Sequence, residues 1–331
     1  MKLFFRRIMF PFLLWARLDK LILFLRKKRC ILVNFHGVVK DKTGQFNNRH
    51  LLESEFEKIL LYFKNNFEIV TLNELFNIHR GNKKQSKKTI CLTFDDGYLN
   101  NFEVALPLLK KHKIPATFYI ISAGLSENNF YVWPDIIDLV QKYSKGDLEF
   151  SFGKFKRPFY FSEDLNCNLV DFIKKSGDNR EAFLNEIKEN CSFYKEKAEL
   201  YPTFTKLVTK ELLFKHKDEE LIEYGSHTHL HYNLEYLSEG LCQSELNESK
   251  KVIEDSIGKK IDSLAFPDGS YNRTTLEQAK KANYTNVVAV EYKLNENNSD
   301  PFILSRFTIS NSTTFESNIL RLARDFDKYG F

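Results

Sequence analysis

Along most of the chain, short runs of β-branched and aromatic residues alternate with longer segments whose apolar residues recur at helical spacing. The short runs predict β-strands at residues 30–35, 68–72, 89–94, 116–121, 221–226, 263–266, 286–290 and 303–309. The helical spacing predicts helices at residues 51–65, 100–112, 241–257 and 274–282. Repeated alternation of strand and helix is typical of a parallel sheet covered by helices. The pattern therefore predicts an α/β fold, a parallel (β/α) barrel of seven or eight strands.

One long stretch, residues 127–220, does not follow this alternation. Its own pattern predicts helices at residues 133–143, 165–175 and 179–196, and a hairpin at residues 148–161. The stretch is too long for a simple connection, so we predict a large, mostly helical insertion. It would divide the barrel into residues 30–126 and residues 221–331. The pattern leaves open whether the insertion shapes a binding groove or only adds stability.

The first 29 residues, 1–29, form a separate basic segment. Its most apolar stretch covers only residues 8–15, which is too short to span a membrane. Apolar residues then recur at helical spacing among several Arg and Lys, at Leu14, Leu18, Leu21, Ile22 and Leu25. The segment is predicted to be a basic amphipathic helix. Two arrangements remain open: the helix lies on an anionic membrane surface, or it packs against one end of the barrel.

Composition narrows the class of protein only slightly. The chain has 331 residues with 43% hydrophobic content, enough for one large domain. The net charge of +5 is small and no nucleic-acid-binding module is visible, so we expect no nucleic-acid partner. The five cysteines are scattered and form no disulfide framework, which favours a cytoplasmic location. Lipid binding by the N-terminal helix would place the protein at the inner face of the cell membrane.

Two adjacent carboxylates, Asp95 and Asp96, follow the predicted strand 89–94 directly. In a parallel barrel this position lies at the C-terminal face, where the chemistry of such barrels takes place. Like charges side by side raise each other's pKa, and a divalent cation relieves that cost. Asp-Asp-Gly by itself is also an ordinary turn sequence. A metal site therefore needs further ligands from elsewhere in the chain.

His227 and His231 supply candidate ligands after the predicted strand 221–226. Their i, i+4 spacing predicts that both imidazoles lie on one face of a helical turn. With Asp96 they would make a two-His, one-carboxylate set that leaves positions open for water and substrate. A histidine pair alone more often belongs to the core or the surface. The combination with the two aspartates makes a metal site the better interpretation.

Several segments resemble the motifs of one known family. Residues 93–97 (Thr-Phe-Asp-Asp-Gly) and the pair His227 and His231 resemble the first two motifs of the polysaccharide deacetylases, the NodB-homology group or carbohydrate esterase family four. Weaker likenesses lie at 265–271, at 300–306 and at 33–37, the last resembling the Tyr-His strand of one subgroup. The resemblance covers roughly residues 30–310. It implies a distorted (β/α) barrel that removes N-acetyl groups from an amino sugar in a surface polysaccharide or its precursor.

The resemblance also implies roles for individual residues. Asp96, His227 and His231 would hold a divalent metal ion, with zinc as the default and cobalt, nickel or manganese as alternatives. Asp95 would be the base that takes a proton from the attacking water. A backbone N–H in the turn Pro267-Asp268-Gly269 would stabilise the oxyanion together with the metal. The expected partner is an acetylated glycan or sugar precursor.

The sequence departs from the usual family pattern in two places. The arginine that would steady the base is absent ahead of Pro267, and Arg306 on the last predicted strand is the candidate substitute. The late histidine that would protonate the leaving amine is also absent, and His36, after the first predicted strand, is the candidate acid. These departures keep open a glycan-binding module of the same fold that has lost catalysis. An amidase acting on a non-glycan substrate also stays open, because the substrate groove would lie in the insertion.

Overall fold

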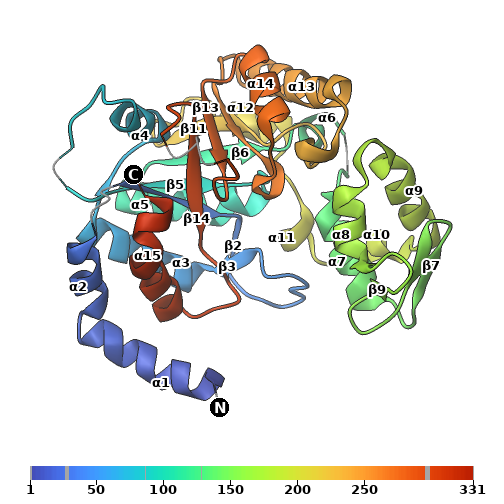
Figure 1. The fold of residues 1–331 in the computed structure, drawn as a ribbon, viewed down its shortest axis with the longest axis horizontal. Helices are drawn as coiled ribbons and strands as arrows, with labels where there is room; N and C mark the ends of the chain where they lie inside the picture. Colours follow the sequence, from blue (N-terminus) through green and yellow to red (C-terminus); the bar gives the residue numbers. More distant parts are fainter. Residues whose placement is uncertain (1, 27–29, 86, 128, 295–298, 331) are drawn as a thin grey trace.

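Seven parallel strands close into a barrel in the computed structural model, which describes residues 2–26, 30–85, 87–127, 129–294 and 299–330 (Figure 1). Around the barrel the strands follow the order β1 (Cys30–Phe35), β14 (Ile303–Thr308), β13 (Asn286–Ala289), β12 (Ser263–Ala265), β11 (Ile222–Ser226), β6 (Ala116–Ile120) and β5 (Thr89–Phe94). Strand β5 then pairs with β1 and closes the ring. The predicted fold class is therefore confirmed.

The barrel is distorted where β5 meets its neighbours. The start of β5 pairs with β4 (Glu68–Ile69), whereas its end, at Thr93 and Phe94, pairs with β6. The predicted strand at 68–72 is thus only two residues long and lies outside the closed ring. Helix α4 (Leu72–His79) begins where that strand was expected to continue, capped by Thr71 and Glu74 in a reciprocal capping box.

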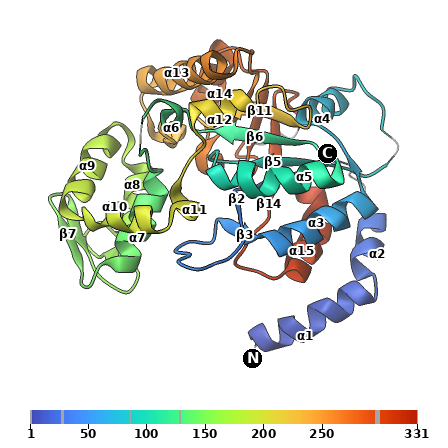
Figure 2. The same cartoon turned by 180° about the vertical axis from the view of Figure 1, so that it is seen from behind.

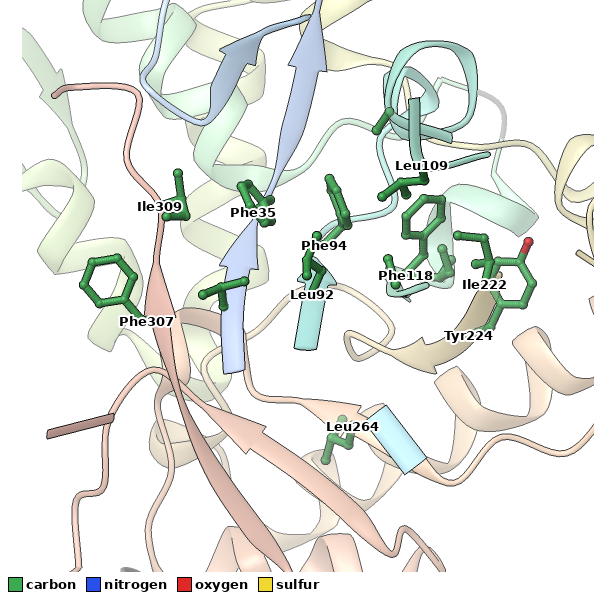
Figure 3. Packing of buried hydrophobic residues seen from close by; sticks show 14 of the residues in the cluster. Phe35, Leu92, Phe94, Leu109, Phe118, Ile222, Tyr224, Leu264, Phe307 and Ile309 are labelled. Carbon is green, nitrogen blue, oxygen red and sulfur yellow. The ribbon is translucent and has the colours of Figure 1, made fainter. Parts of the chain in front are cut away.

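Both faces of the barrel strands are buried, as expected of a parallel sheet covered by helices. The outward side chains pack against the surrounding helices. Among them, the Phe94 ring stacks on Phe35 with centroids 5.2 Å apart and meets Phe118 edge-on at 5.1 Å (Figure 3). Side chains of this size contribute most to the hydrophobic stabilisation of a core. The same aromatic and β-branched residues therefore predict the strands in the sequence and hold the strands against the helices in the fold.

The inside of the barrel changes from apolar to polar along its axis. Cys30, Leu32 and Cys91 belong to an apolar cluster that also includes side chains of α4. Two residues further along β1 and β5, the inward positions are taken by Asn34 and Thr93, which are buried and polar. Because side chains alternate along a strand, these positions follow directly from the register. The polar layer lies toward the C-terminal ends of the strands.

Helices surround the barrel on its outside (Figures 1 and 2). They are α3 (Glu53–Asn66), η1 (Asn101–Ala105), α5 (Leu106–His112), α6 (Ala123–Ser126), α13 (Glu239–Ile257), α14 (Arg273–Lys281) and α15 (Phe315–Tyr329). Short elements in the connections are β2 (Gly37–Val39), β3 (His50–Leu52), η3 (Leu234–Tyr236) and η4 (Pro267–Gly269). The sequence pattern does not predict α15, although Ile319, Leu322 and Phe326 recur at helical spacing and are fully buried.

A second lobe lies beside the barrel (Figures 1 and 2). Its elements are α7 (Trp133–Tyr143), β7 (Leu148–Phe150), β8 (Gly153–Phe155), β9 (Phe161–Ser162), β10 (Cys167–Asn168), α8 (Leu169–Lys175), η2 (Gly177–Asn179), α9 (Arg180–Asn190) and α10 (Phe193–Leu200). Helices α11 (Pro202–Thr205) and α12 (Lys210–Lys215) lead back to the barrel. The lobe has its own hydrophobic cluster, built from residues 133–198. The domain boundaries at 126/127 and 220/221 stay predictions.

The N-terminal segment forms two helices, α1 (Lys2–Trp15) and α2 (Leu18–Leu25), separated at Arg17, which adopts a left-handed conformation with φ 57°. Both lie near α15, and Leu23 is buried against the core. Residues 27–29, part of the predicted basic segment, lie outside the described residues. Among the described residues, no helix has the length and apolar content needed to cross a bilayer.

Candidate active site

The predicted site residues meet at one cavity of about 170 Å³. Those that line it are His36, Asp95, Asp96, His227, His231, Asp268 and Gly269. They follow the ends of β1, β5, β11 and β12 and therefore come from four different strands. Arg306 lies beneath the cavity inside the barrel, and Pro267 is buried in the turn beside it. The cavity lies at the end of the barrel where parallel barrels carry their chemistry.

Asp95 is held by a buried arginine. Arg306 Nη1 donates to Asp95 Oδ1 at 2.7 Å and Nη2 donates to Oδ2 at 2.9 Å, while Asn34 Nδ2 also donates to Oδ2 at 3.0 Å. The Arg306 side chain is 0% exposed. Burial by itself would raise the pKa of Asp95, but the charge and hydrogen bonds of Arg306 outweigh burial and hold that pKa well below its usual value. Asp95 is therefore an anion at every physiological pH.

Asp96 experiences the opposite environment. Its backbone is left-handed, with φ 70°, and its side chain is buried. In the described part of the chain, no group forms a hydrogen bond with Asp96 Oδ1. Burial and the neighbouring Asp95 anion raise the pKa of Asp96 well above its usual value. A buried carboxylate without a cation is costly, so this oxygen requires either a proton or a metal ion.

The two histidines are not on a helix, so that prediction is wrong. After β11, residues 227–233 form an irregular loop in which Thr228 and His231 have φ 66° and φ 60°. The N–H of Thr228 donates to Ser226 Oγ. The strand pairing ends at His227, whose N–H still donates to the carbonyl of Ile120, and the chain then turns through its left-handed residues. These turns, rather than helical periodicity, bring the two imidazoles together.

The geometry of the three candidate ligands fits a tetrahedral metal. Asp96 Oδ1 lies 3.5 Å from His227 Nε2 and 3.4 Å from His231 Nε2. Tetrahedral ligands about 2.1 Å from zinc are roughly 3.4 Å from one another. The nearest Asp95 oxygen lies farther from His227 Nε2, at 3.9 Å. The measured spacing therefore matches a site made of Asp96, His227 and His231.

The protonation of the histidines agrees with this assignment. The Ala265 carbonyl can only accept, so His227 Nδ1 carries the hydrogen of their 2.8 Å bond and Nε2 keeps its lone pair. Burial lowers the pKa of His227, and burial together with His227 lowers the pKa of His231 well below its usual value. Both imidazoles are therefore neutral, as metal ligands must be. The residues present fit a divalent metal ion.

The turn Pro267–Gly269 lies on another side of the cavity. Asp268 and Gly269 have φ 54° and φ 63°, and the N–H groups of Gly269 and Ser270 donate within the turn. Among the described hydrogen bonds, none uses the N–H of Asp268. The Asp268 carboxylate accepts from Asn233 Nδ2 at 2.9 Å and forms a 3.0 Å ion pair with Lys174 of the second lobe. The second lobe therefore contributes directly to this wall of the site.

Sequence reasoning missed several residues that line the cavity, among them Asn34, Arg49 and Tyr98. Arg49 forms ion pairs with Asp135 and Asp138 of α7, the latter at 2.6 Å, and Tyr98 donates to Asp135 at 2.9 Å. Asn34 could have been found, because it is a polar residue at an inward position of a buried strand. Arg49 carries no local signal, since its partners lie on a helix more than 80 residues away.

A closed parallel barrel with a two-His, one-carboxylate centre beside a second, ionised carboxylate has the architecture of a hydrolase. Comparison with protein families identifies the family of hydrolases. The polysaccharide deacetylase family model matches residues 82–150 and 169–287, and the chain belongs to this family. Its members are carbohydrate deacetylases, so the protein is an enzyme of the hydrolase class.

Relatives and solved structures agree with this assignment. A poly-beta-1,6-N-acetyl-D-glucosamine N-deacetylase of Staphylococcus aureus is 24% identical over 316 residues, which cover 89% of this chain and 83% of that protein. The structure of IcaB from Ammonifex degensii matches with a TM-score of 0.57 at 17% identity, covering 90% of this chain and 98% of that one. The Streptococcus pyogenes deacetylase PplD matches with a TM-score of 0.55 at 18% identity, covering 88% and 96%. At these identities the two structures support the fold alone.

The site predicts different effects for its two aspartates on metal binding. Asp96→Asn should weaken zinc binding at least about 100-fold, because it removes a direct anionic ligand. Asp95→Asn should change the zinc dissociation constant less than about threefold, since Asp95 is held by Arg306. Isothermal titration calorimetry on both variants, with circular dichroism to check folding, measures the difference. An equal loss in both would make Asp95 a ligand.

Proposed function

We propose that this enzyme is a metal-dependent deacetylase that removes N-acetyl groups from an amino sugar of a surface polysaccharide or its precursor. One observation carries the proposal: Asp96, His227 and His231 converge on a buried point beside a carboxylate that Arg306 keeps ionised. The activity for which the Staphylococcus aureus relative is named supports an N-acetylated glucosamine polymer as the substrate class. Within the described residues, no feature favours a non-glycan amidase or an inactive binding module.

Asp96, His227 and His231 would hold the metal, with zinc as the first candidate and cobalt, nickel or manganese as alternatives. When bound, such an ion polarises the acetyl carbonyl and lowers the pKa of the attacking water, an effect of several kcal/mol. Asp95 accepts the proton that the water loses as it attacks the carbonyl carbon. Arg306 and Asn34 orient the carboxylate for this step, because together they fix both of its oxygens.

His36 then delivers the proton to the leaving nitrogen. Burial lowers the pKa of His36 to about 4, so the imidazole is neutral at the start of a cycle at pH 7. Asp95 and His36 line the same cavity, so in this proposal the proton that Asp95 takes from the water is passed on to the imidazole. Transfer from His36 to the amide nitrogen allows the C–N bond to break, which releases acetate and the free amine.

The backbone of the Pro267–Gly269 turn is suited to stabilise the oxyanion that forms during attack. The N–H of Asp268 is the unused donor there, because the N–H of Gly269 already bonds to the carbonyl of Phe266. Asp268 has a left-handed backbone, and its side chain is held by contacts with Asn233 and Lys174. This donor is pre-oriented before substrate arrives, which is the condition for effective electrostatic stabilisation.

Acetate release tests the proposed function directly. The enzyme should release acetate from β-1,6-linked N-acetylglucosamine oligomers, lose this activity with a chelator, and regain it with zinc. Nucleotide-linked N-acetylglucosamine tests whether the enzyme acts on a sugar precursor. N-acetylated amino acids test whether it is an amidase for a non-glycan substrate. Asp95→Asn is the matched inactive control. Release from amino acids alone would establish an amidase instead, and zinc binding without any release would indicate a degenerate module.

His36→Ala should lower turnover by roughly 10²–10⁴-fold, the usual contribution of general acid catalysis. Its zinc affinity should stay unchanged, because His36 is outside the ligand set. The matched control is His112→Ala, whose ring bonds to Glu57 Oε1 at 2.8 Å and does not line the catalytic cavity. Steady-state kinetics of both zinc-loaded variants give the comparison. Wild-type turnover in a folded His36→Ala protein would rule out this residue as the acid.

We further propose that the N-terminal helices bind an anionic membrane surface, which would hold a cytoplasmic enzyme at the inner face of the cell membrane. Large apolar side chains point away from the barrel there: Trp15, Phe24 and Leu25 are 80%, 82% and 70% exposed. The exposed cations Arg17 and Lys20 lie among them. Aromatic side chains beside basic ones are typical of helices at the membrane interface. The buried Leu23 and Asp19 show that another face of α2 packs on the protein, so the two arrangements are compatible.

Vesicle binding distinguishes this proposal from a helix that only packs. The double variant Trp15→Ser/Phe24→Ser should bind phosphatidylglycerol vesicles at least about tenfold more weakly than the wild type, since burying each ring is worth on the order of 1.5–3 kcal/mol. Leu200→Ser, at a 58% exposed apolar residue of the second lobe, is the matched control. Co-sedimentation at two salt concentrations measures the affinities. Equal binding by the double variant would exclude the membrane role.

A further inference from the structure

The loop that carries the two histidine ligands is strained. Thr228 and His231 are non-glycine residues with positive φ only three positions apart. Such a backbone conformation is energetically costly for a non-glycine residue and persists only where surrounding groups fix it. The metal set depends on this conformation, because the loop rather than a helix brings His227 and His231 together. The contacts that hold the loop are therefore candidates for a functional role.

The carbonyl groups of the loop are fixed by elements on two sides. Ser122 N–H donates to the Thr228 carbonyl at 3.2 Å, and Ala123 N–H donates to the His229 carbonyl at 3.1 Å. From the second lobe, Trp133 Nε1 donates to the His231 carbonyl at 2.8 Å. These donors come from the start of α6 and from α7. Among the described backbone hydrogen bonds, none provides an acceptor for the N–H groups of His229 and Leu230 in the middle of the loop.

One side chain satisfies both of these N–H groups. Glu245, on α13, accepts from His229 N–H at 3.0 Å and from Leu230 N–H at 2.9 Å, both with Oε2. The residue is 7% exposed. A single carboxyl oxygen that accepts two consecutive backbone N–H bonds fixes the orientation of both peptide groups. Removing it would leave two half-buried donors unsatisfied, which is energetically costly.

We propose that Glu245 is a positioning residue for the metal centre. Its carboxylate fixes the backbone between His227 and His231 and thereby holds their two Nε2 atoms at ligand spacing. Glu245 does not line the catalytic cavity, and its contacts with the loop are the N–H groups of His229 and Leu230 and the side chain of Thr228, so it acts through the loop rather than on a ligand side chain. The part concerning metal affinity rests on the proposed function, whereas the part concerning the loop conformation does not.

Three variants separate this role from general stabilisation. Glu245→Ala removes the acceptor, and Glu245→Gln keeps an oxygen at the same place. Glu248→Ala changes an exposed carboxylate one turn further along the same helix and serves as the matched control. Zinc affinity is measured by competition with a chromogenic chelator. Hydrogen–deuterium exchange on the metal-free proteins reports protection of the His229 and Leu230 amides, and melting temperatures report overall stability.

Glu245→Ala should bind zinc roughly 10–100-fold more weakly, the usual effect of losing a group that orients metal ligands. Its amides at 229 and 230 should lose protection in the metal-free protein, whereas Glu245→Gln and Glu248→Ala should stay within about threefold of wild type. If Glu245→Ala does not fold, Glu245→Gln decides: zinc affinity and amide protection within about threefold of wild type support the proposal. Wild-type protection and zinc affinity in Glu245→Ala, or equal losses in Glu245→Gln, would overturn the proposal. A wild-type protein that binds no zinc would refute the proposed function while the exchange data still test the loop.

Discussion

The buried ion pair between Arg306 and Asp95 is the interaction on which the site depends. Two adjacent carboxylates in one buried cavity cannot both carry charge without compensation. Arg306 compensates one of them with a bidentate contact inside the barrel, so the other, Asp96, remains to be neutralised by a metal or a proton. The two adjacent aspartates therefore differ in what neutralises them: Arg306 for Asp95, and a metal ion or a proton for Asp96. Breaking such a pair by removing one partner costs about 3–5 kcal/mol, so the pair also couples the site to the stability of the fold.

Closure of the barrel creates this pair. Arg306 lies on the last strand, opposite Leu32 of the first, and its inward position follows from the parallel register of β14 and β1. The second lobe completes the site from the other side. Its Trp133 bonds to the loop carbonyl of His231, and its Lys174 pairs with Asp268 in the turn Pro267–Gly269. Segments far apart in the sequence therefore hold the catalytic groups, and no single segment forms the site alone.

The strands and the convergence of the aspartates and histidines could be predicted from sequence, because strand composition and position at strand ends are local signals. Arg306 could also be predicted as the partner of Asp95, because the family pattern implies an arginine that steadies the base. The conformation of the histidine loop could not be predicted, because i, i+4 spacing fits both a helical turn and a loop with left-handed residues. Thr228 gives no local sign of its positive φ. Arg49 was missed since only tertiary packing brings it beside Asp135.

Anomalous diffraction from crystals grown with zinc tests the central claim most directly, because it locates the metal without relying on activity. The account predicts one strong peak within about 2.0–2.2 Å of Asp96, His227 and His231, the coordination distance of zinc. Asp95 should remain paired with Arg306 in the same crystal. A peak bound by Asp95, with Arg306 displaced from it, would contradict the division of roles between the two aspartates. Absence of a peak at the three ligands would contradict the metal centre itself.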